Sequence, residues 1–291
     1  MSMPDPRNPL PRDPAMPYAH ILLATDLDGT FLGPDSRPVP RNIRAVERFK
    51  AGGGYFTAAT GRIHMDLLRI IPDAATLFNA PAIMANGAYL YDFATGESFA
   101  ETLMEPEAVL AFVRFVRDRI PDVGVRLSTS RGFLADSEDQ NPFILRDMRG
   151  GHRCRNALLI PMSQWPLDEM KLYKIVVRGT PEALVAARRT LENHFGDLFS
   201  YTSSSPSFLE VQAGGCTKGT GLAALSAWLE NRKGQRPFTL AAGNHENDLP
   251  MLEAADEAAC PSDALEDIKP FCRYILCPYA EGCIADLIDR L

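Results

Sequence analysis

Residues 21–30 read Ile-Leu-Leu-Ala-Thr-Asp-Leu-Asp-Gly-Thr, an apolar run that ends in two aspartates and a glycine. The run predicts a buried strand from His20 to Thr25, with Asp26 and Asp28 just beyond its end. Two carboxylates two residues apart suit phosphoryl chemistry, because one can attack phosphorus while the other handles the proton, and both can share a divalent cation. The same sequence also occurs in ordinary surface turns.

The segments that flank this stretch alternate between strand and helix patterns. A helix is expected over residues 40–50, where Ile43, Val46 and Phe49 recur at helical spacing, and a strand is expected over residues 55–59. This alternation favours an α/β fold with a parallel sheet and helices on its faces. Active sites in such sheets gather at the carboxyl ends of strands, where Asp26 and Thr60 fall.

The middle of the chain has a different order of predicted elements. It mixes hairpins with helices, which indicates an α+β layer rather than more of the parallel sheet. Helices are expected over residues 105–120, 143–148 and 181–195, and strands over 88–92, 123–128, 132–135, 171–177, 198–202 and 208–212. The alternating pattern then returns, with strands at 239–242, 257–260 and 274–276. We therefore expect a domain over residues 88–208, inserted between core segments 20–87 and 209–291.

The composition of the chain argues against some classes of binding partner and of cellular location. The chain has 291 residues with 46% hydrophobic and 23% charged residues and a formal net charge of -7, which argues against nucleic acid or an anionic membrane as a partner. No apolar stretch is near the length needed to span a bilayer. Residues 1–19 are expected to form a disordered, proline-rich tail rather than a secretory signal, so a cytoplasmic location is predicted.

The six cysteines do not form a metal-binding pattern. Their spacings contain no Cys-x-x-Cys pair, and apolar residues separate them. Buried free thiols are expected rather than zinc ligands or disulfides. The glycines at residues 52–54 are interpreted as a helix stop, because they follow a helix rather than a strand.

Four features at strand ends or helix starts follow one another along the chain. They are Asp26 with Asp28, then Thr60, then Lys218, and finally the segment from Asn244 to Asp248. Each alone has an ordinary structural explanation, such as a turn, a helix cap or a solvated lysine. Their occurrence together, in this order, favours a single site.

This set of motifs resembles the haloacid dehalogenase-like (HAD) hydrolases, and within them the Cof-type phosphatases of subfamily IIB. The segment around Asn86-Gly87-Ala88, the strand Phe208–Val211 and the run Gly243–Leu252 support the likeness. It extends from about Ile21 to the C-terminus. The resemblance implies a Rossmann-like parallel-sheet core with an inserted α+β cap that closes over a small phosphorylated metabolite.

The resemblance also implies a role for each motif. Asp26 would be the nucleophile that forms an aspartyl-phosphate, and Asp28 would be the acid and base. The implied phosphate-binding residues are Thr60, Gly61 and Lys218. Mg²⁺ is the implied cofactor, bound by Asp26, the backbone carbonyl of Asp28, Asn244 and Asp248. Arg62, Asn86 and Asn247 are accessory candidates for substrate binding.

Asn244 departs from the family pattern, which has an aspartate at this position. An asparagine can still coordinate through its oxygen but carries no charge, so weaker Mg²⁺ binding is expected unless Asp248 or Glu246 compensates. His245 is expected to have no metal role, since Mg²⁺ prefers oxygen ligands.

The expected reaction is Mg²⁺-dependent hydrolysis of a small phosphorylated metabolite, with a sugar phosphate as the default. The alternatives are a sugar phosphomutase, an enzyme similar to sucrose phosphatase, or a non-catalytic sugar-phosphate binding protein whose metal site has weakened. Arg126, Lys174 and Glu210 are polar candidates on the cap that the sequence does not rank. No oligomeric state is predicted.

Overall fold

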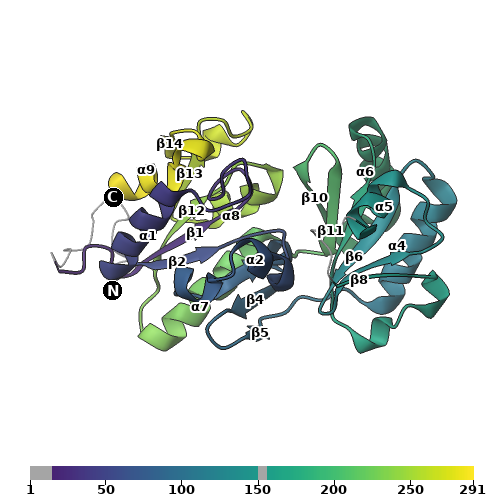
Figure 1. Cartoon of the computed structure of the whole chain (residues 1–291), viewed down its shortest axis with the longest axis horizontal. Helices are drawn as coiled ribbons and strands as arrows, with labels where there is room; N and C mark the ends of the chain where they lie inside the picture. Colours follow the sequence, from purple (N-terminus) through teal and green to yellow (C-terminus); the bar gives the residue numbers. More distant parts are fainter. Residues whose placement is uncertain (1–14, 150–155) are drawn as a thin grey trace.

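The computed structural model describes residues 15–149 and 156–291, which form two lobes (Figure 1). One lobe is built on a five-stranded parallel sheet with the order β14-β13-β12-β1-β2. Its strands are β1 (Ile21–Thr25), β2 (Tyr55–Ala58), β12 (Phe238–Ala242), β13 (Glu257–Pro261) and β14 (Tyr274–Leu276). Because β1 lies between β12 and β2, the aspartates that follow it emerge at the middle of the carboxyl edge.

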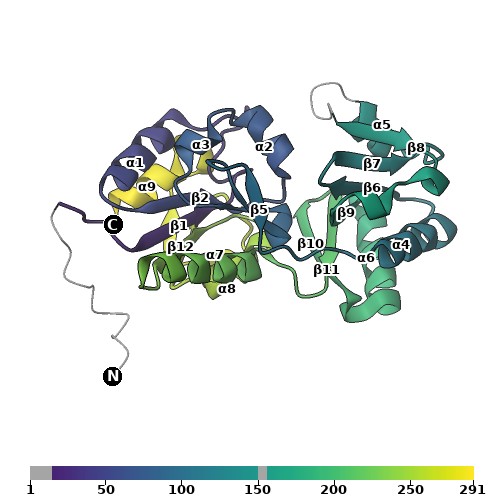
Figure 2. The ribbon, with the colours of Figure 1, turned by 90° about the horizontal axis from the view of Figure 1, so that it is seen from below.

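Helices cover both faces of the parallel sheet. Leu23 of β1 packs in one apolar layer with α1 and α9, and its neighbour Leu22 packs in the other with α7 and α8. Figure 2 shows these two pairs of helices on opposite faces. The helices are α1 (Pro40–Ala51), α9 (Cys283–Asp289), α7 (Lys218–Lys233) and α8 (Leu249–Ala254). Burial on both faces explains why the first four residues of β1 are all apolar.

A small antiparallel sheet adjoins this core. Its strands are β3 (Ala82–Met84), β4 (Tyr89–Asp92) and β5 (Glu97–Phe99), and a bridge between Ala59 and Ile83 joins it to the end of β2. The short helices α2 (His64–Ile70) and α3 (Ala74–Leu77) lie between β2 and β3 in the chain. The turn η1 (Ala85–Gly87) joins β3 to β4 and carries Asn86 in a left-handed conformation with φ +59°.

The second lobe contains a six-stranded, largely antiparallel sheet with the order β10-β11-β9-β6-β7-β8. Its strands are β6 (Gly124–Thr129), β7 (Gly132–Asp136), β8 (Ala157–Ile160), β9 (Leu172–Arg178), β10 (Phe199–Ser205) and β11 (Phe208–Ala213). Only the pairing of β7 with β8 is parallel among these described strands. The predicted α/β core with an inserted α+β cap is confirmed.

The two faces of the cap sheet differ. Helices α4 (Pro106–Arg119) and α6 (Pro181–Phe195) cover one face with an apolar cluster that includes Ile175 and Val211. On the other face, α5 (Pro142–Arg149) packs against Ala135 of β7. Figure 2 shows that the strands β9, β11 and β10 lie nearest to the core lobe. Polar side chains of the less covered face can therefore meet the core.

The strand pairing bears on the expected domain boundaries at residues 87/88 and 208/209. β4 and β5 pair with β3 beside the parallel sheet, whereas β11 pairs with β9 and β10 in the cap sheet. A strand belongs to the lobe of its hydrogen-bonding partners, whatever its order in the chain. We therefore propose that the cap runs from the start of α4 to the end of β11, in place of residues 88–208.

The structure contains short elements that the sequence did not predict, namely β3, β5, β8, α2, α3, α8 and α9, which are three to seven residues long. The longer expected helices and strands are confirmed to within a few residues. A periodic pattern cannot be recognised in so few residues, so these short elements depend on tertiary contacts for their definition.

Two further expectations concern the chain end and the cysteines. Residues 1–14 of the expected tail lie outside the described residues, but Tyr18 packs against Phe49 and donates its N–H to the Gly52 carbonyl, so residues 15–19 join the folded core. Cys154 also lies outside the described residues. The described cysteines are free thiols, as expected, and three are buried.

No described helix is both long and apolar enough to cross a membrane.

Candidate active site

The two aspartates leave β1 on a turn that approaches the segment following β12. The Asp26 N–H donates to the last carbonyl of β12 at 2.8 Å, which fixes the start of this turn. Gly29 has a φ of +79°, and a Cβ at this position would collide with the amide of Asn244. The glycine of the motif therefore lets the aspartate turn and the Asn244 segment lie against each other.

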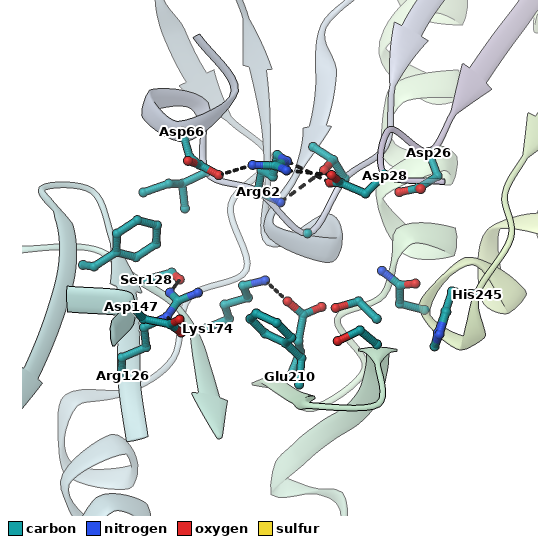
Figure 3. Close-up of a pocket in the computed structure, with 18 of the residues that line it drawn as sticks. Asp26, Asp28, Arg62, Asp66, Arg126, Ser128, Asp147, Lys174, Glu210 and His245 are labelled. Atoms are coloured by element: carbon teal, nitrogen blue, oxygen red, sulfur yellow. Dashed lines mark hydrogen bonds and ion pairs between the residues drawn. The ribbon is translucent and has the colours of Figure 1, made fainter. Parts of the chain in front are cut away.

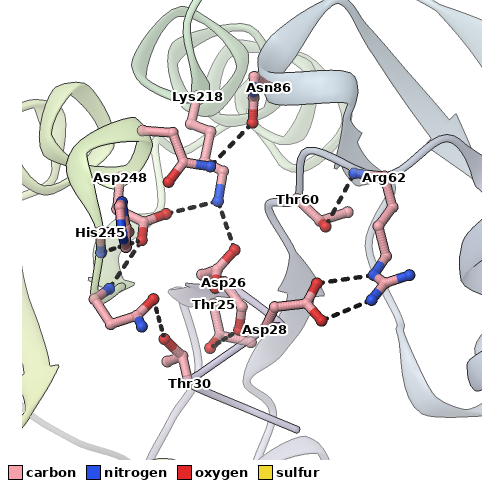
Figure 4. A network of polar contacts seen from close by, with 12 residues as sticks. Thr25, Asp26, Asp28, Thr30, Thr60, Arg62, Asn86, Lys218, His245 and Asp248 are labelled. Carbon is pink, nitrogen blue, oxygen red and sulfur yellow. Dashed lines mark hydrogen bonds and ion pairs between the residues drawn. The ribbon is translucent and has the colours of Figure 1, made fainter. Parts of the chain in front are cut away.

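Lys218 lies in the first turn of α7 with its side chain fully buried. Its Nζ donates to Oδ1 of Asp26 and to Oδ1 of Asp248, each at 2.6 Å (Figure 4). Burial disfavours the charged ammonium, but the carboxylates of Asp248 and Asp26 raise the pKa of Lys218 above its ordinary value. The explanation as a solvated lysine is therefore wrong. Thr217 is the N-cap of this helix, since its hydroxyl accepts from the N–H of Thr220.

Asp26 and Asp248 share this one ammonium. Burial raises the pKa of Asp26 to about 7, although Lys218 opposes the shift. Oδ2 of Asp248 accepts from the backbone N–H groups of Asn244 and His245 at 2.8 and 3.0 Å. Asp248 thus fixes both the lysine and the loop that begins at Asn244.

Arg62 holds the second aspartate of the motif. Its Nε and Nη2 donate to the two carboxylate oxygens of Asp28 at 2.8 and 2.6 Å, and its Nη1 donates to Asp66 at 2.6 Å. The backbone N–H of Arg62 donates to the buried hydroxyl oxygen of Thr60 at 3.2 Å, which leaves the hydroxyl proton available for a ligand. Asp28 is thus oriented by a charge-assisted pair of hydrogen bonds.

Asn86 links the core loops to the cap. Its amide nitrogen donates to Glu210 Oε2 on β11 at 2.8 Å, and its amide oxygen accepts from Asn247 at 3.2 Å. Glu210 is also paired with Lys174 on β9, and both side chains are buried. Burial favours the neutral carboxyl, but Lys174 lowers the pKa of Glu210 below its ordinary value. The cap thus places an ion pair directly over Gly61 of the core.

A second set of contacts joins the cap to the loop after β12. A ring nitrogen of His245 lies 2.9 Å from the backbone carbonyl of Ser203 on β10. Arg188 on α6 donates to Glu246 at 2.7 Å. The residues on either side of these contacts, Asn244 and Asn247, both line the cavity described next.

A cavity of about 290 Å³ lies between the two lobes (Figure 3). The core side of its wall includes Asp26, Asp28, Thr60 and Gly61. A second set of residues, from the cap, forms the opposite side. The cap set comprises Arg126, Ser128, Phe133, Asp147, Lys174, Ser204, Ser205, Phe208 and Glu210. Lys218 and Asp248 lie behind the wall and reach the cavity through Asp26.

Comparison with known proteins identifies the family. The sequence model of the haloacid dehalogenase-like hydrolases matches residues 23–288, which is most of the chain. The chain belongs to this family. The hydrolase is similar to the HMP-PP phosphatase of Yersinia pestis, with 26% identity over 254 residues that cover 85% of this chain and 86% of the relative. The predicted family and enzyme class are confirmed.

Solved structures of the family share the fold of this hydrolase. A haloacid dehalogenase-like hydrolase from B. subtilis aligns with a TM-score of 0.80 and 21% identity, covering 93% of this chain and 99% of the other. The HAD subclass IIB sugar phosphatase BT4131 aligns with a TM-score of 0.75 and 20% identity, covering 92% and 98%. The hydrolase therefore shares the two-lobed fold of these structures.

The oxygen atoms near Asp26 suit a hard cation. Carboxylates of Asp26 and Asp248 and the amide of Asn244 lie around one turn, and Asn244 Oδ1 accepts only a long hydrogen bond, 3.4 Å, from Thr30. Mg²⁺ prefers such oxygen donors. Within residues 15–149 and 156–291, no three His, Cys, Asp or Glu side chains form a metal-binding group. The donor set thus fits Mg²⁺, with the neutral amide of Asn244 beside two carboxylates.

The hydrolase site includes residues that the motifs did not single out. Asp66 and Arg188 were not predicted. Glu246 was named only as a charge that could compensate for Asn244, and Lys174 and Glu210 were named without a rank. Lys174 and Glu210 each interrupt an apolar strand with a charge, and a charge at such a position is a signal that it has a specific partner. The pairing of β9 with β11, which brings them together, is not readable from either strand alone.

Proposed function

We propose that this hydrolase is a phosphatase that cleaves a small phosphorylated metabolite through a phosphorylated Asp26. One observation supports this best: the buried Lys218 holds Asp26 at the wall of the cavity, with Thr60 and Gly61 on the same wall. A carboxylate nucleophile needs a fixed position and neutralised charge before it can approach an anionic phosphate. The names of the relatives, HMP-PP phosphatase and sugar phosphatase, agree with this proposal.

In the first step, a carboxylate oxygen of Asp26 attacks phosphorus, and the bond between phosphorus and the leaving oxygen breaks. Asp28 donates a proton to that oxygen, so an alcohol departs. The Thr60 hydroxyl and the Gly61 backbone N–H are proposed to bind the phosphoryl oxygens, with Lys218 neutralising charge. Since Arg62 occupies both oxygens of Asp28, this proton transfer requires the pair to open, and Asp66 then keeps Arg62 in place.

In the second step, water attacks the phosphorus of the aspartyl-phosphate. Asp28 takes one proton from that water, the acyl-phosphate bond breaks, and inorganic phosphate and the free Asp26 carboxylate result. The cap limits the entry of other water, because Lys174 and Glu210 cover Gly61. Asn86 and Asn247 are proposed to hold the core loops in register with the cap.

Asp26, the Asp28 carbonyl, Asn244 and Asp248 are the residues proposed to hold Mg²⁺. When bound, the ion supplies positive charge that reduces repulsion between Asp26 and the phosphate. The cavity volume of about 290 Å³ favours a small substrate, and a sugar phosphate is the proposed default.

The test is phosphate release from p-nitrophenyl phosphate and a panel of sugar phosphates, with Mg²⁺ and with EDTA. We expect Mg²⁺-dependent release by the wild type, and we expect Asp26→Asn to reduce kcat by at least about 10⁴-fold while the protein stays folded. Asp73→Asn is the matched control, because Asp73 is exposed and makes no helix-capping hydrogen bond. Full activity in D26N would refute the mechanism. Absence of release at any metal concentration would favour a binding protein instead.

A further inference from the structure

The cations of the cavity wall differ in how firmly they are already held. Arg62 makes three hydrogen bonds to carboxylates at 2.6 to 2.8 Å, and Lys174 forms a buried ion pair with Glu210. Lys218, just behind the wall, is bound by two carboxylates at 2.6 Å. Arg126 makes only longer contacts, at 3.3 Å to Asp147 and 3.4 Å to Ser128.

The carboxylate that Arg126 contacts is itself engaged more closely by another arginine. Asp147 accepts from Arg178 Nε at 2.9 Å and from Arg178 Nη2 at 3.4 Å. Two guanidinium groups thus share one carboxylate, and Arg178 has the closer contact. The positive charge of Arg126 is therefore less fully neutralised by Asp147 than that of Arg178.

The position of Arg126 keeps its guanidinium in the cavity. It extends from β6 over the ring of Phe133 on β7, with the guanidinium carbon 4.4 Å from the ring centre. Arg126, Phe133 and Ser128 all line the same cavity as Asp26. Figure 3 shows Arg126 on the cap wall, well away from Asp26 and beside Asp147. Stacking on a ring fixes the plane of the guanidinium without consuming its N–H donors.

We propose that Arg126 binds a second anionic group of the substrate, a carboxylate or a phosphate, at the end of the molecule remote from the group that is hydrolysed. This rests on the proposed phosphatase function and narrows its substrate class to phosphate monoesters that carry another acidic group. A planar guanidinium pairs with either oxyanion through two parallel N–H donors. A loosely held arginine loses little when it exchanges an existing partner for the ligand.

The test compares substrates that differ by one acidic group. Wild-type kcat/KM is measured for glucose 6-phosphate against 6-phosphogluconate, which adds a carboxylate, and for fructose 6-phosphate against fructose 1,6-bisphosphate, which adds a phosphate. We expect the doubly acidic member of at least one pair to be preferred, and the pair that shows this distinguishes the two oxyanions. In R126Q that preference should fall about tenfold or more, through KM.

Arg131→Gln is the matched control, since Arg131 is an exposed arginine of the same hairpin, paired with Glu169 outside the cavity. R131Q should keep the wild-type preference. R126K retains the charge but not the planar pair of donors and should lose part of the preference, which decides the matter if R126Q does not fold. A wild type with no preference in either pair, or a preference unchanged in R126Q and R126K, would overturn the proposal. Absence of hydrolysis of every substrate would instead refute the phosphatase function.

Discussion

At the scale of single residues, Asn244 is the proposed metal-binding side chain that carries no charge. Its backbone N–H is bound by Asp248, its amide packs against Gly29, and its oxygen accepts a hydrogen bond from Thr30. The loop therefore holds this side chain beside Asp26 whether or not it is charged. The side chain is thus positioned by its contacts, although it carries no negative charge.

We predict that Asn244→Asp tightens Mg²⁺ binding at least tenfold, or by about 1.4 kcal/mol, because a carboxylate attracts the ion more strongly than a neutral amide. Without metal, the variant should melt at a lower temperature than the wild type, since its new charge faces Asp26 and Asp248 with only Lys218 to balance them. Titration calorimetry and thermal unfolding with EDTA measure the two effects. An affinity that is unchanged or weaker would contradict the prediction.

The site residues fall into two groups, those whose position in the fold could be predicted from the sequence and those whose position could not. Asp26, Thr60 and Lys218 each stand at the end of a strand or the start of a helix, so the fold that the pattern predicts also brings them to one edge. Arg126 and Lys174 lie within strands of the cap, and their surroundings depend on pairing with distant segments. Sequence patterns could name these two residues but could not place them.

At the scale of elements, the central strand β12 is tied to the residue before β13 by a carboxylate. Asp256 Oδ2 accepts from the N–H and the hydroxyl of Thr239, each at 2.8 Å, and Asp256 also accepts from Arg236 at 3.0 Å. Partial burial alone would raise the pKa of Asp256, but the hydrogen bonds from Thr239 and Arg236 lower it below its ordinary value of 3.8. The folded state therefore favours the ionised carboxylate.

We predict that Asp256→Asn lowers the free energy of unfolding by about 1–2 kcal/mol at pH 7. Because the folded-state pKa is depressed, the stabilisation is fully present above the ordinary pKa and is lost as the pH falls through the lowered value. The difference between wild type and D256N should thus be constant from pH 7 to about pH 5 and narrow below 3.8. Urea unfolding across this range measures it. The exposed Asp267→Asn is the control, and a difference that grows on acidification would contradict this account.

The elements also show why chain order alone does not assign β11 to a domain. β11 follows β10 by a short turn, and its alternating pattern reads equally well as the last strand of the cap or the first of the core. Its register with β9 and β10 decides the question in favour of the cap. The pairing with β9 joins residues thirty or more positions apart, which a local pattern does not contain.

At the scale of the whole molecule, most of each lobe's apolar side chains pack within that lobe, and the lobes meet through polar contacts and one buried aromatic contact, where Tyr173 of β9 stacks on Tyr89 of β4 with ring centres 4.1 Å apart. Arg188 with Glu246 and His245 with Ser203 join them on one side, and Glu210 with Asn86 joins them over the cavity. Interfaces between domains that are more polar than a protein core usually permit relative motion. Closure of the cap therefore depends on a few short contacts that a single added group can disturb.

Gly61 is the place where such a group would act. A Cβ on Gly61 would lie 3.1 Å from Glu210 Oε2, 3.1 Å from Asn86 Oδ1 and 3.2 Å from Lys174 Nζ. The three side chains are joined in a buried network, in which Glu210 accepts from the Asn86 amide and from Lys174, so a shift of any of them disturbs the contacts that hold the cap. Two of the three belong to the cap.

We predict that Gly61→Val holds the cap open, which increases the radius of gyration in small-angle scattering and lowers kcat by about tenfold to a hundredfold. Gly61→Ala should fall between the valine variant and the wild type. Gly33→Ala is the matched control, because the neighbours of a Cβ there begin at 3.4 Å and all lie within the core. Since scattering reports the lobe separation independently of chemistry, G61V with wild-type scattering but reduced kcat would assign Gly61 to phosphate binding alone. It would also remove the argument that Gly61 permits closure.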